Sequence, residues 1–157
     1  METRFDLLGS PLMGQFIRRF NAASQVAAES SLPRSVHDLV LIRASQINGC
    51  GMCTDMHTKD ALAAGETQQR INLVAAWRDA TVFTEPERAA LALTEEGTRL
   101  ADAATGVPDE VWQAARKHFD EEQLAALIAA IAVINAWNRL NVIAGTPAGG
   151  YQPGQFA

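Results

Sequence analysis

The chain has 157 residues, the size of one domain. Hydrophobic residues make up 48% of it, aromatic residues only 6%, and its formal net charge is −5 at neutral pH. This composition, in which alanine dominates, favours closely packed helices over a sheet protein. The acidic balance argues against a nucleic-acid partner and against an anionic membrane surface.

The sequence predicts neither a signal peptide nor a membrane-spanning segment. The start of the chain, Met1–Asp6, has no basic segment followed by an apolar run, so we expect no signal peptide. The most apolar stretch, Leu124–Ile134, is far short of a membrane span. We therefore expect a cytoplasmic protein, in which a permanent disulfide is disfavoured but a catalytic disulfide that forms and breaks is allowed.

Two helices are expected before the cysteines. The first opens at Ser10-Pro11 and runs towards Glu29. Its expected apolar face consists of Leu12, Phe16, Ile17 and Phe20. Leu32-Pro33 then interrupts the chain, and residues 34–47 carry apolar side chains at spacings of three and four.

Four more helices are expected after the cysteine segment. A short one covers Thr67–Trp77, and a capping box at Thr84–Glu87 opens a long one that ends at about Asp102. Another starts at Gly106-Val107-Pro108 and ends near Phe119. The last, residues 121–143, is apolar on nearly every face, which predicts a central position or a subunit interface.

The remaining signals complete the expected organisation. Residues 145–157 are rich in Gly and Pro and predict an irregular tail. The acidic pair Glu95-Glu96 is expected on a solvated helix face. No segment alternates with a period of two, so residues 1–157 predict an all-α, single-domain helical bundle with its core at about 32–143.

Both cysteines lie in one short run, and a histidine follows them. Cys50 and Cys53 are three apart, and His57 is four residues further on. A helix over 51–64, started after Asn48-Gly49, would place these side chains on one face with Cys50 at the N-cap. A helix N-terminus lowers a thiol pKa, and His57 adds a proton acceptor. The pattern predicts a dithiol/disulfide site.

Two other interpretations of the cysteines remain open. They could be small buried hydrophobes. They could instead bind zinc together with His57, with Asp55, His37 or Asp38 as a fourth ligand, although two thiolates three apart on a regular helix suit tetrahedral zinc poorly. Haem attachment would need a histidine directly after the second cysteine, where Thr54 stands.

The polar residues around this motif have simpler interpretations when taken alone. Asp38 would be a solvated carboxylate beside His37. The polar residues of the last helix would make hydrogen bonds in the core or at an interface: Trp137, Asn138, Arg139 and Asn141.

The run Leu39–His57 closely resembles the alkylhydroperoxidase D-like branch of the carboxymuconolactone decarboxylase family, and the likeness extends over about Leu32–Val142. The resemblance implies that Cys53 is the peroxidatic cysteine, which becomes a sulfenic acid. Cys50 would supply a proton and then close the disulfide, and His57 would relay protons. Asp38, one methylene shorter, holds the position of the family's relay glutamate.

The resemblance implies a peroxidase-type enzyme of antioxidant defence that reduces alkyl hydroperoxides through the Cys50–Cys53 disulfide, with no metal or organic cofactor. It also implies a lipoyl or thioredoxin-like dithiol reductant and a trimeric or hexameric homo-oligomer. Met52 replaces a histidine found between the cysteines in well-studied members. The alternative is a redox adapter that passes electrons from a dithiol donor to a peroxiredoxin.

Overall fold

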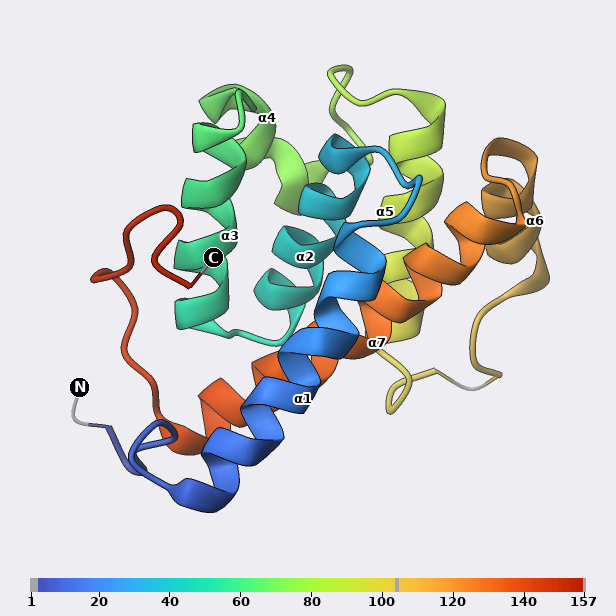
Figure 1. The fold of residues 1–157 in the computed structure, drawn as a ribbon. Coiled ribbons are helices and arrows are strands. Elements are labelled where there is room, and N and C mark those ends of the chain that lie inside the picture. The colour runs from blue at the N-terminus through green and yellow to red at the C-terminus, as the bar shows by residue number, and fades with distance from the viewer. Residues whose placement is uncertain (1–2, 104, 157) are drawn as a thin grey trace.

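The computed structural model describes residues 3–103 and 105–156 (Figure 1). Within these ranges the chain forms helices and no strand, which confirms the all-α prediction. In chain order they are α1 (Pro11–Ala28), α2 (Arg34–Ile47), α3 (Gly51–Ala63), α4 (Gln68–Leu73), a 3-10 turn (Val74–Ala76), α5 (Glu85–Thr98), α6 (Asp109–His118) and α7 (Glu121–Ala144).

Capping residues set most of these boundaries. The Ser10 hydroxyl accepts the Met13 N–H at the start of α1, and Thr84 with Glu87 forms the expected capping box of α5. Two helices are shorter than expected. The predicted helix over Thr67–Trp77 splits into α4 and the 3-10 turn.

The helix that was expected to continue to Asp102 ends at Thr98. Gly97 and Thr98 are weak helix formers, and Arg99 leaves the helical conformation at φ −90° and ψ 31°. The Arg99 guanidinium turns back to Glu95, at 3.2 Å, so this helix end is anchored by a side chain.

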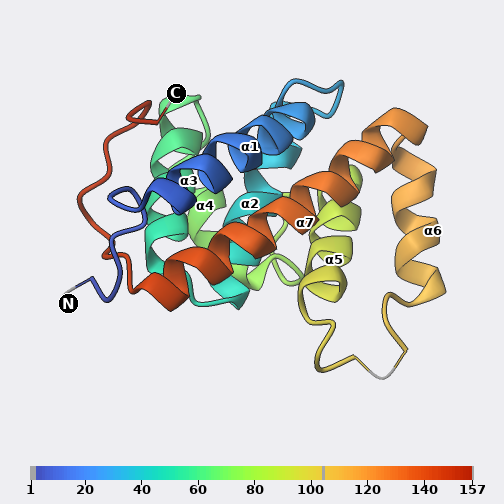
Figure 2. The same cartoon turned by 60° about the horizontal axis from the view of Figure 1, so that its bottom comes forward.

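Helix α2 lies at the centre of the bundle, where it packs against α3, α5 and α7 (Figures 1 and 2). Helix α7 crosses the bundle beside α1 and α2. One core cluster joins α2, α5 and α7 through residues such as Val40, Leu93 and Leu127. A second joins α2 to the 3-10 turn and α5 through Ile42, Val74 and Leu91.

Length and composition alone would let α7 cross a membrane, at a mean hydropathy of 1.5. In the bundle, however, this helix is a core element, because Leu127, Ile134 and Asn138 on it are fully buried. Its expected central position is therefore confirmed. Ile128 and Ile143 nevertheless point outwards and are 51% and 72% exposed.

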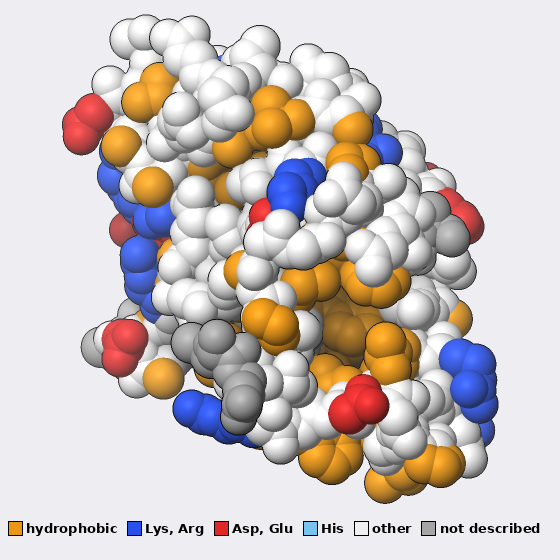
Figure 3. Space-filling model, turned by 90° about the vertical axis from the view of Figure 1, so that its left-hand side faces the viewer, with side chains coloured by type: hydrophobic (Ala, Val, Ile, Leu, Met, Phe, Trp, Pro, Cys, Tyr) orange, Lys and Arg blue, Asp and Glu red, His pale blue; other side chains and the backbone are white. Residues whose placement is uncertain are grey.

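The expected apolar face of α1 is only partly buried. Phe20 packs against Trp137 at 4.9 Å between ring centroids, but Leu12 is 74% exposed. Leu12, Phe16 and Phe20 line a shallow apolar hollow instead of core. Figure 3 views another side of the molecule, with α3 and the C-terminal tail, where apolar side chains also surround a hollow.

The tail after α7 is irregular, as predicted, yet it is fixed to α3. Asp55 accepts the backbone N–H of Gly149 at 2.9 Å, and Lys59 donates to the carbonyl oxygen of Tyr151 at 2.9 Å. The buried Tyr151 hydroxyl donates to the Asp60 carboxylate at 2.8 Å. The tail therefore forms a strap along the cysteine helix (Figure 1).

Candidate redox site

The short connection between α2 and α3 places both cysteines. Gly49 adopts the left-handed conformation, φ 63°, which ends α2 and reverses the chain. The backbone N–H of Cys50 then donates to the Ser45 carbonyl at 3.0 Å. Cys50 becomes the N-cap of α3, and its sulfur accepts the backbone N–H of Cys53 at 3.3 Å. The predicted N-cap position is confirmed.

Both thiols are buried between α2, α3 and α7. Each cysteine is only 1% exposed, and the pair packs with Ala44 and Ile134. The side-chain amide of Asn141 lies 3.6 Å from the Cys53 sulfur. The pair thus lies in apolar surroundings, into which the side-chain amides of Asn141 and Asn138 reach.

A network of amides lies beneath the cysteine pair. Asn48 donates to the side-chain oxygens of Asn135 and Asn138, each at 2.9 Å. Asn138 is fully buried and donates in turn to the Ser45 hydroxyl at 3.1 Å. The polar residues of α7 therefore make the hydrogen bonds expected of them, and one of them, Asn141, also reaches the cysteine pair.

One proton is shared unequally between the thiols. The Cys53 thiol donates to the Cys50 sulfur, and this hydrogen bond, against the effect of burial, lowers the pKa of Cys50 to about 7. The same hydrogen bond, together with burial and the Cys50 charge, raises the pKa of Cys53. Above about pH 7 the reduced pair therefore carries one negative charge on Cys50, whereas the family resemblance makes Cys53 the attacking sulfur.

His57 lies one turn after Cys53, on the side of α3 that faces α2. Burial and, to a smaller extent, the charge of His37 lower the pKa of His57 to about 4, and Asp38 opposes both effects. The imidazole is accordingly neutral at pH 7, which suits a group that accepts and passes on a proton.

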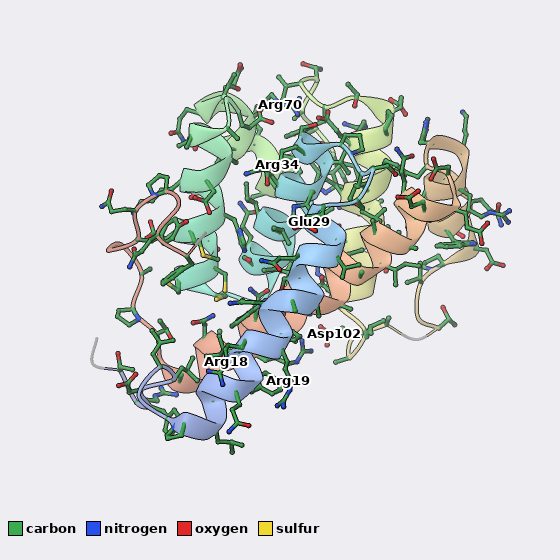
Figure 4. All side chains as sticks on the ribbon, in the orientation of Figure 1. Arg18, Arg19, Glu29, Arg34, Arg70 and Asp102 are labelled. Carbon is green, nitrogen blue, oxygen red and sulfur yellow. The ribbon has the colours of Figure 1, made fainter. Side chains whose placement is uncertain are left out.

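Asp38 is not the solvated carboxylate that its sequence context suggests when taken alone. Its side chain is 12% exposed, and Arg34 Nε donates to both carboxylate oxygens at 2.9 and 2.8 Å. His37 Nδ1 lies 3.9 Å from Asp38 Oδ1. Figure 4 shows Arg34 at the start of α2, the end of the helix that lies away from the cysteines.

The geometry does not favour the zinc interpretation. Within residues 3–103 and 105–156, no three His, Cys, Asp or Glu side chains gather as a metal-binding group. The hydrogen-bonded cysteine pair points its sulfurs at one another and at amides, with His57 set apart along α3.

A buried carboxylate at Glu95 is the main feature that the sequence did not reveal. The expectation that Glu95 is solvated is wrong, because it is 1% exposed. It accepts from Arg43 Nε at 2.7 Å, from Trp77 Nε1 at 2.9 Å, and from Arg78. These donors lower the pKa of Glu95 to about 2 against the effect of its burial.

The signal for Glu95 was present in the spacing of α5. Leu91 is fully buried, and Glu95 stands four residues later on the same face, so a carboxylate there must be paired. Likewise, the i,i+4 spacing of Arg34 and Asp38 on α2 would have predicted their ion pair.

Comparison with known proteins identifies the family of this chain. The model of the carboxymuconolactone decarboxylase family matches residues 11–96, from α1 through the cysteine helix to Glu96. The chain belongs to the carboxymuconolactone decarboxylase family. The match spans more than half of the molecule and includes the whole α2–α3 unit.

Family relatives extend the likeness beyond the matched segment. The uncharacterised protein YdfG of Bacillus subtilis is 43% identical over 120 residues, which are 76% of this chain and 80% of YdfG. The structure of ATU0492 from Agrobacterium tumefaciens, a protein of unknown function, has a TM-score of 0.88 at 34% identity. It covers 96% of this chain and 100% of its own, and it places this family member among the alkylhydroperoxidase D-like proteins.

The family fold alone does not determine the reaction. The debrominase Bmp8 in complex with 2,3,4-tribromopyrrole shares the fold, with a TM-score of 0.76 over 84% of this chain and 70% of its own. Its sequence identity is 17%. Any assignment of activity therefore has to rest on the cysteine site itself.

Proposed function

We propose that this protein reduces hydroperoxides through a dithiol/disulfide cycle of Cys50 and Cys53. The observation that carries the proposal is the buried, hydrogen-bonded thiol pair at the start of α3, in which one sulfur has a pKa of about 7. A thiolate is the nucleophile that peroxide reduction needs, and a second thiol within reach is what resolves the product.

The shared proton gives each sulfur a role. When the proton moves from Cys53 to Cys50, Cys53 becomes the thiolate and attacks the distal oxygen of the peroxide. The O–O bond breaks, Cys53 becomes a sulfenic acid, and the departing alkoxide takes the proton from Cys50. Cys50 then attacks the Cys53 sulfur, forming the disulfide and releasing hydroxide, which is protonated to water.

An external dithiol restores the reduced pair by thiol–disulfide exchange and leaves as its own disulfide. A lipoyl or thioredoxin-like donor supplies that chemistry. The related ATU0492 is described as a candidate antioxidant-defence protein AhpD, which supports the same assignment. His57 and Asp38 are the proposed groups through which protons reach and leave the pair.

Single-turnover oxidation tests the proposal. Reduced protein without a reductant should consume one equivalent of hydroperoxide and lose both thiols together. Cys53→Ser should abolish this consumption, whereas Cys50→Ser should leave a sulfenic acid that dimedone traps on Cys53. Trapping on residue 50 in Cys53→Ser would reverse the two roles, and no consumption by the wild-type protein would contradict the peroxidase assignment.

The second candidate function is that of a redox adapter between a dithiol donor and a peroxiredoxin. The acidic Cys50 thiol at the N-cap of α3 supports it, because thiol–disulfide exchange needs the same thiolate and no peroxide. A protein that exchanges its disulfide with a dithiol but consumes no peroxide alone would support this alternative.

We further propose a symmetric homo-oligomer, a trimer or hexamer. The exposed apolar side chains of α1 and α7 support it, since Leu12 and Ile143 are 74% and 72% exposed. Light scattering should give a multiple of the 16.9 kDa chain mass. A monomeric mass would contradict the proposal.

A further inference from the structure

The histidine that faces His57 across the two helices is His37. Helices α2 and α3 run in opposite directions from their connection at Asn48-Gly49 and pack closely together. Leu41 of α2 packs against the cluster that contains Cys53 of α3. His37 stands one turn before Leu41, and His57 stands one turn after Cys53. Since the helices are antiparallel, these two steps lead to the same level.

Asp38 lies at a different level along α3. Asp38 and Ala61 line the same hollow, of about 210 Å³, between the start of α2 and the end of α3. Arg34 holds the Asp38 carboxylate there. One carboxylate oxygen, Asp38 Oδ1, lies 3.9 Å from His37 Nδ1.

We propose that His37 is a positioning residue of the proton path, a second imidazole that links His57 to Asp38 and to solvent. This inference rests on the proposed dithiol function. A proton released by the cysteine pair passes to His57 and then to His37, from which it leaves to water. In the return direction, the proton that converts hydroxide to water follows the reverse route.

The surrounding charges support this direction. Asp38 Oδ1 lies 3.9 Å from His37 Nδ1, and Arg34 Nε donates to the same carboxylate. His57 on α3 and Glu66, three residues after its end, also lie near this junction. Glu66 lines the hollow beside Asp38 and is paired with Arg70 at 2.9 Å. His37 is 13% exposed in its side chain, enough to exchange a proton with water.

The first test measures the His57 imidazole by NMR titration in the reduced protein. Removal of the His37 charge in His37→Gln should raise the pKa of His57, by up to about one unit for a like charge at short range. His118→Gln removes the remaining histidine, on α6, and should leave the His57 titration unchanged. An unchanged His57 titration in His37→Gln would overturn the inference.

The second test follows proton transfer. Single-turnover oxidation by hydroperoxide at pH 6–7 should slow about tenfold or more in His37→Ala, since general acid–base assistance is worth about 10²–10⁴-fold. Added imidazole should restore the rate, which a merely structural defect would not allow. No slowing, or slowing that imidazole does not restore, would overturn the inference. If wild-type protein consumes no peroxide, alkylation of the thiols by iodoacetamide supplies the rate instead, so the two proposals fail separately.

Discussion

Two buried polar clusters lie in this bundle, and they differ in the hydrogen-bond donors that surround them: charged in one and neutral in the other. Around Glu95, a carboxylate that is 1% exposed meets guanidinium groups, and its pKa falls to about 2. Around Cys50 and Cys53, equally buried thiols meet the side-chain amide of Asn141 and a backbone N–H, and the pKa of Cys50 is about 7.

The difference separates a structural charge from a reactive one. Full positive charges fix Glu95 in a single ionisation state at every physiological pH. Neutral donors lower the pKa of Cys50 only to about 7, so the cysteine pair can gain or lose a proton near neutral pH. The charged cluster fastens α2 to α5 and the segment after α4, while the amide-lined pocket is left free to change its protonation.

Neutralising Glu95 gives the largest expected effect. Glu95→Gln leaves the buried guanidinium of Arg43, 11% exposed, without a counter-charge. We expect it to lower the free energy of unfolding by about 3–5 kcal/mol, measured by urea denaturation. Glu96→Gln, at the next and more exposed position, is the control and should change it by less than about 0.5 kcal/mol. Equal losses of stability in Glu95→Gln and Glu96→Gln would contradict a structural role for the Glu95 cluster.

Lowering the pH should also reveal the contribution of Glu95 to stability. Glu95 has a depressed pKa, so its contribution to stability is present above its ordinary value of 4.5 and is lost as the pH falls through about 2. The loss should approach about 3 kcal/mol, from a shift of roughly two and a half units. In Glu95→Gln the loss should be smaller by that amount, and Asp55 and Glu87, whose pKa values are also lowered, should account for the remainder. An unchanged loss of stability in Glu95→Gln would contradict the role of Glu95.

Unlike Glu95, which stays ionised near neutral pH, the thiol pair should change its charge there. Thiolate absorbance at 240 nm should rise once, with a midpoint at about pH 7. In Cys53→Ala the donated hydrogen bond is missing, so the midpoint should move up towards the ordinary thiol pKa of 9.0. A midpoint that stays near 7 would mean that the helix terminus, rather than Cys53, sets the acidity of Cys50.

The smallest expected effect concerns the cap of α3. Cys50→Ala removes the side chain that accepts the Cys53 N–H and should lower the free energy of unfolding by about 0.5–2 kcal/mol. Cys50→Ser keeps an acceptor and should remain close to wild type. Urea denaturation of the two reduced variants measures the difference between their free energies of unfolding. An Ala variant as stable as the Ser variant would contradict the capping role.

The fold was readable from the sequence because its signals are local. The stop at Asn48-Gly49, the Thr84–Glu87 capping box and the apolar run of α7 each fixed a helix boundary or position. The cysteine motif likewise placed Cys50 at the N-cap. The exposed face of α1 was not predictable, since periodicity shows that a face is apolar but not what covers it.

The features that the sequence did not predict depend on contacts between residues that are far apart in the chain. The partners of Glu95 come from α2 and from the segment after α4, so its burial depends on packing between helices. The direction of the proton between the cysteines is also a tertiary property. It depends on which sulfur accepts the Cys53 N–H and on the amides of α7, neither of which the spacing of the motif reveals.

The sulfur cap at the start of α3 would also affect the reduction potential of the proposed disulfide. In the proposed cycle, forming the disulfide would consume the Cys50 thiolate, so the oxidised chain would lose a charged acceptor at the positive end of a helix. Stabilisation of the reduced form by about 1 kcal/mol corresponds to about 20 mV for a two-electron couple. The helix terminus would therefore make the proposed disulfide more oxidising and would shift its equilibrium with a dithiol donor towards reduction.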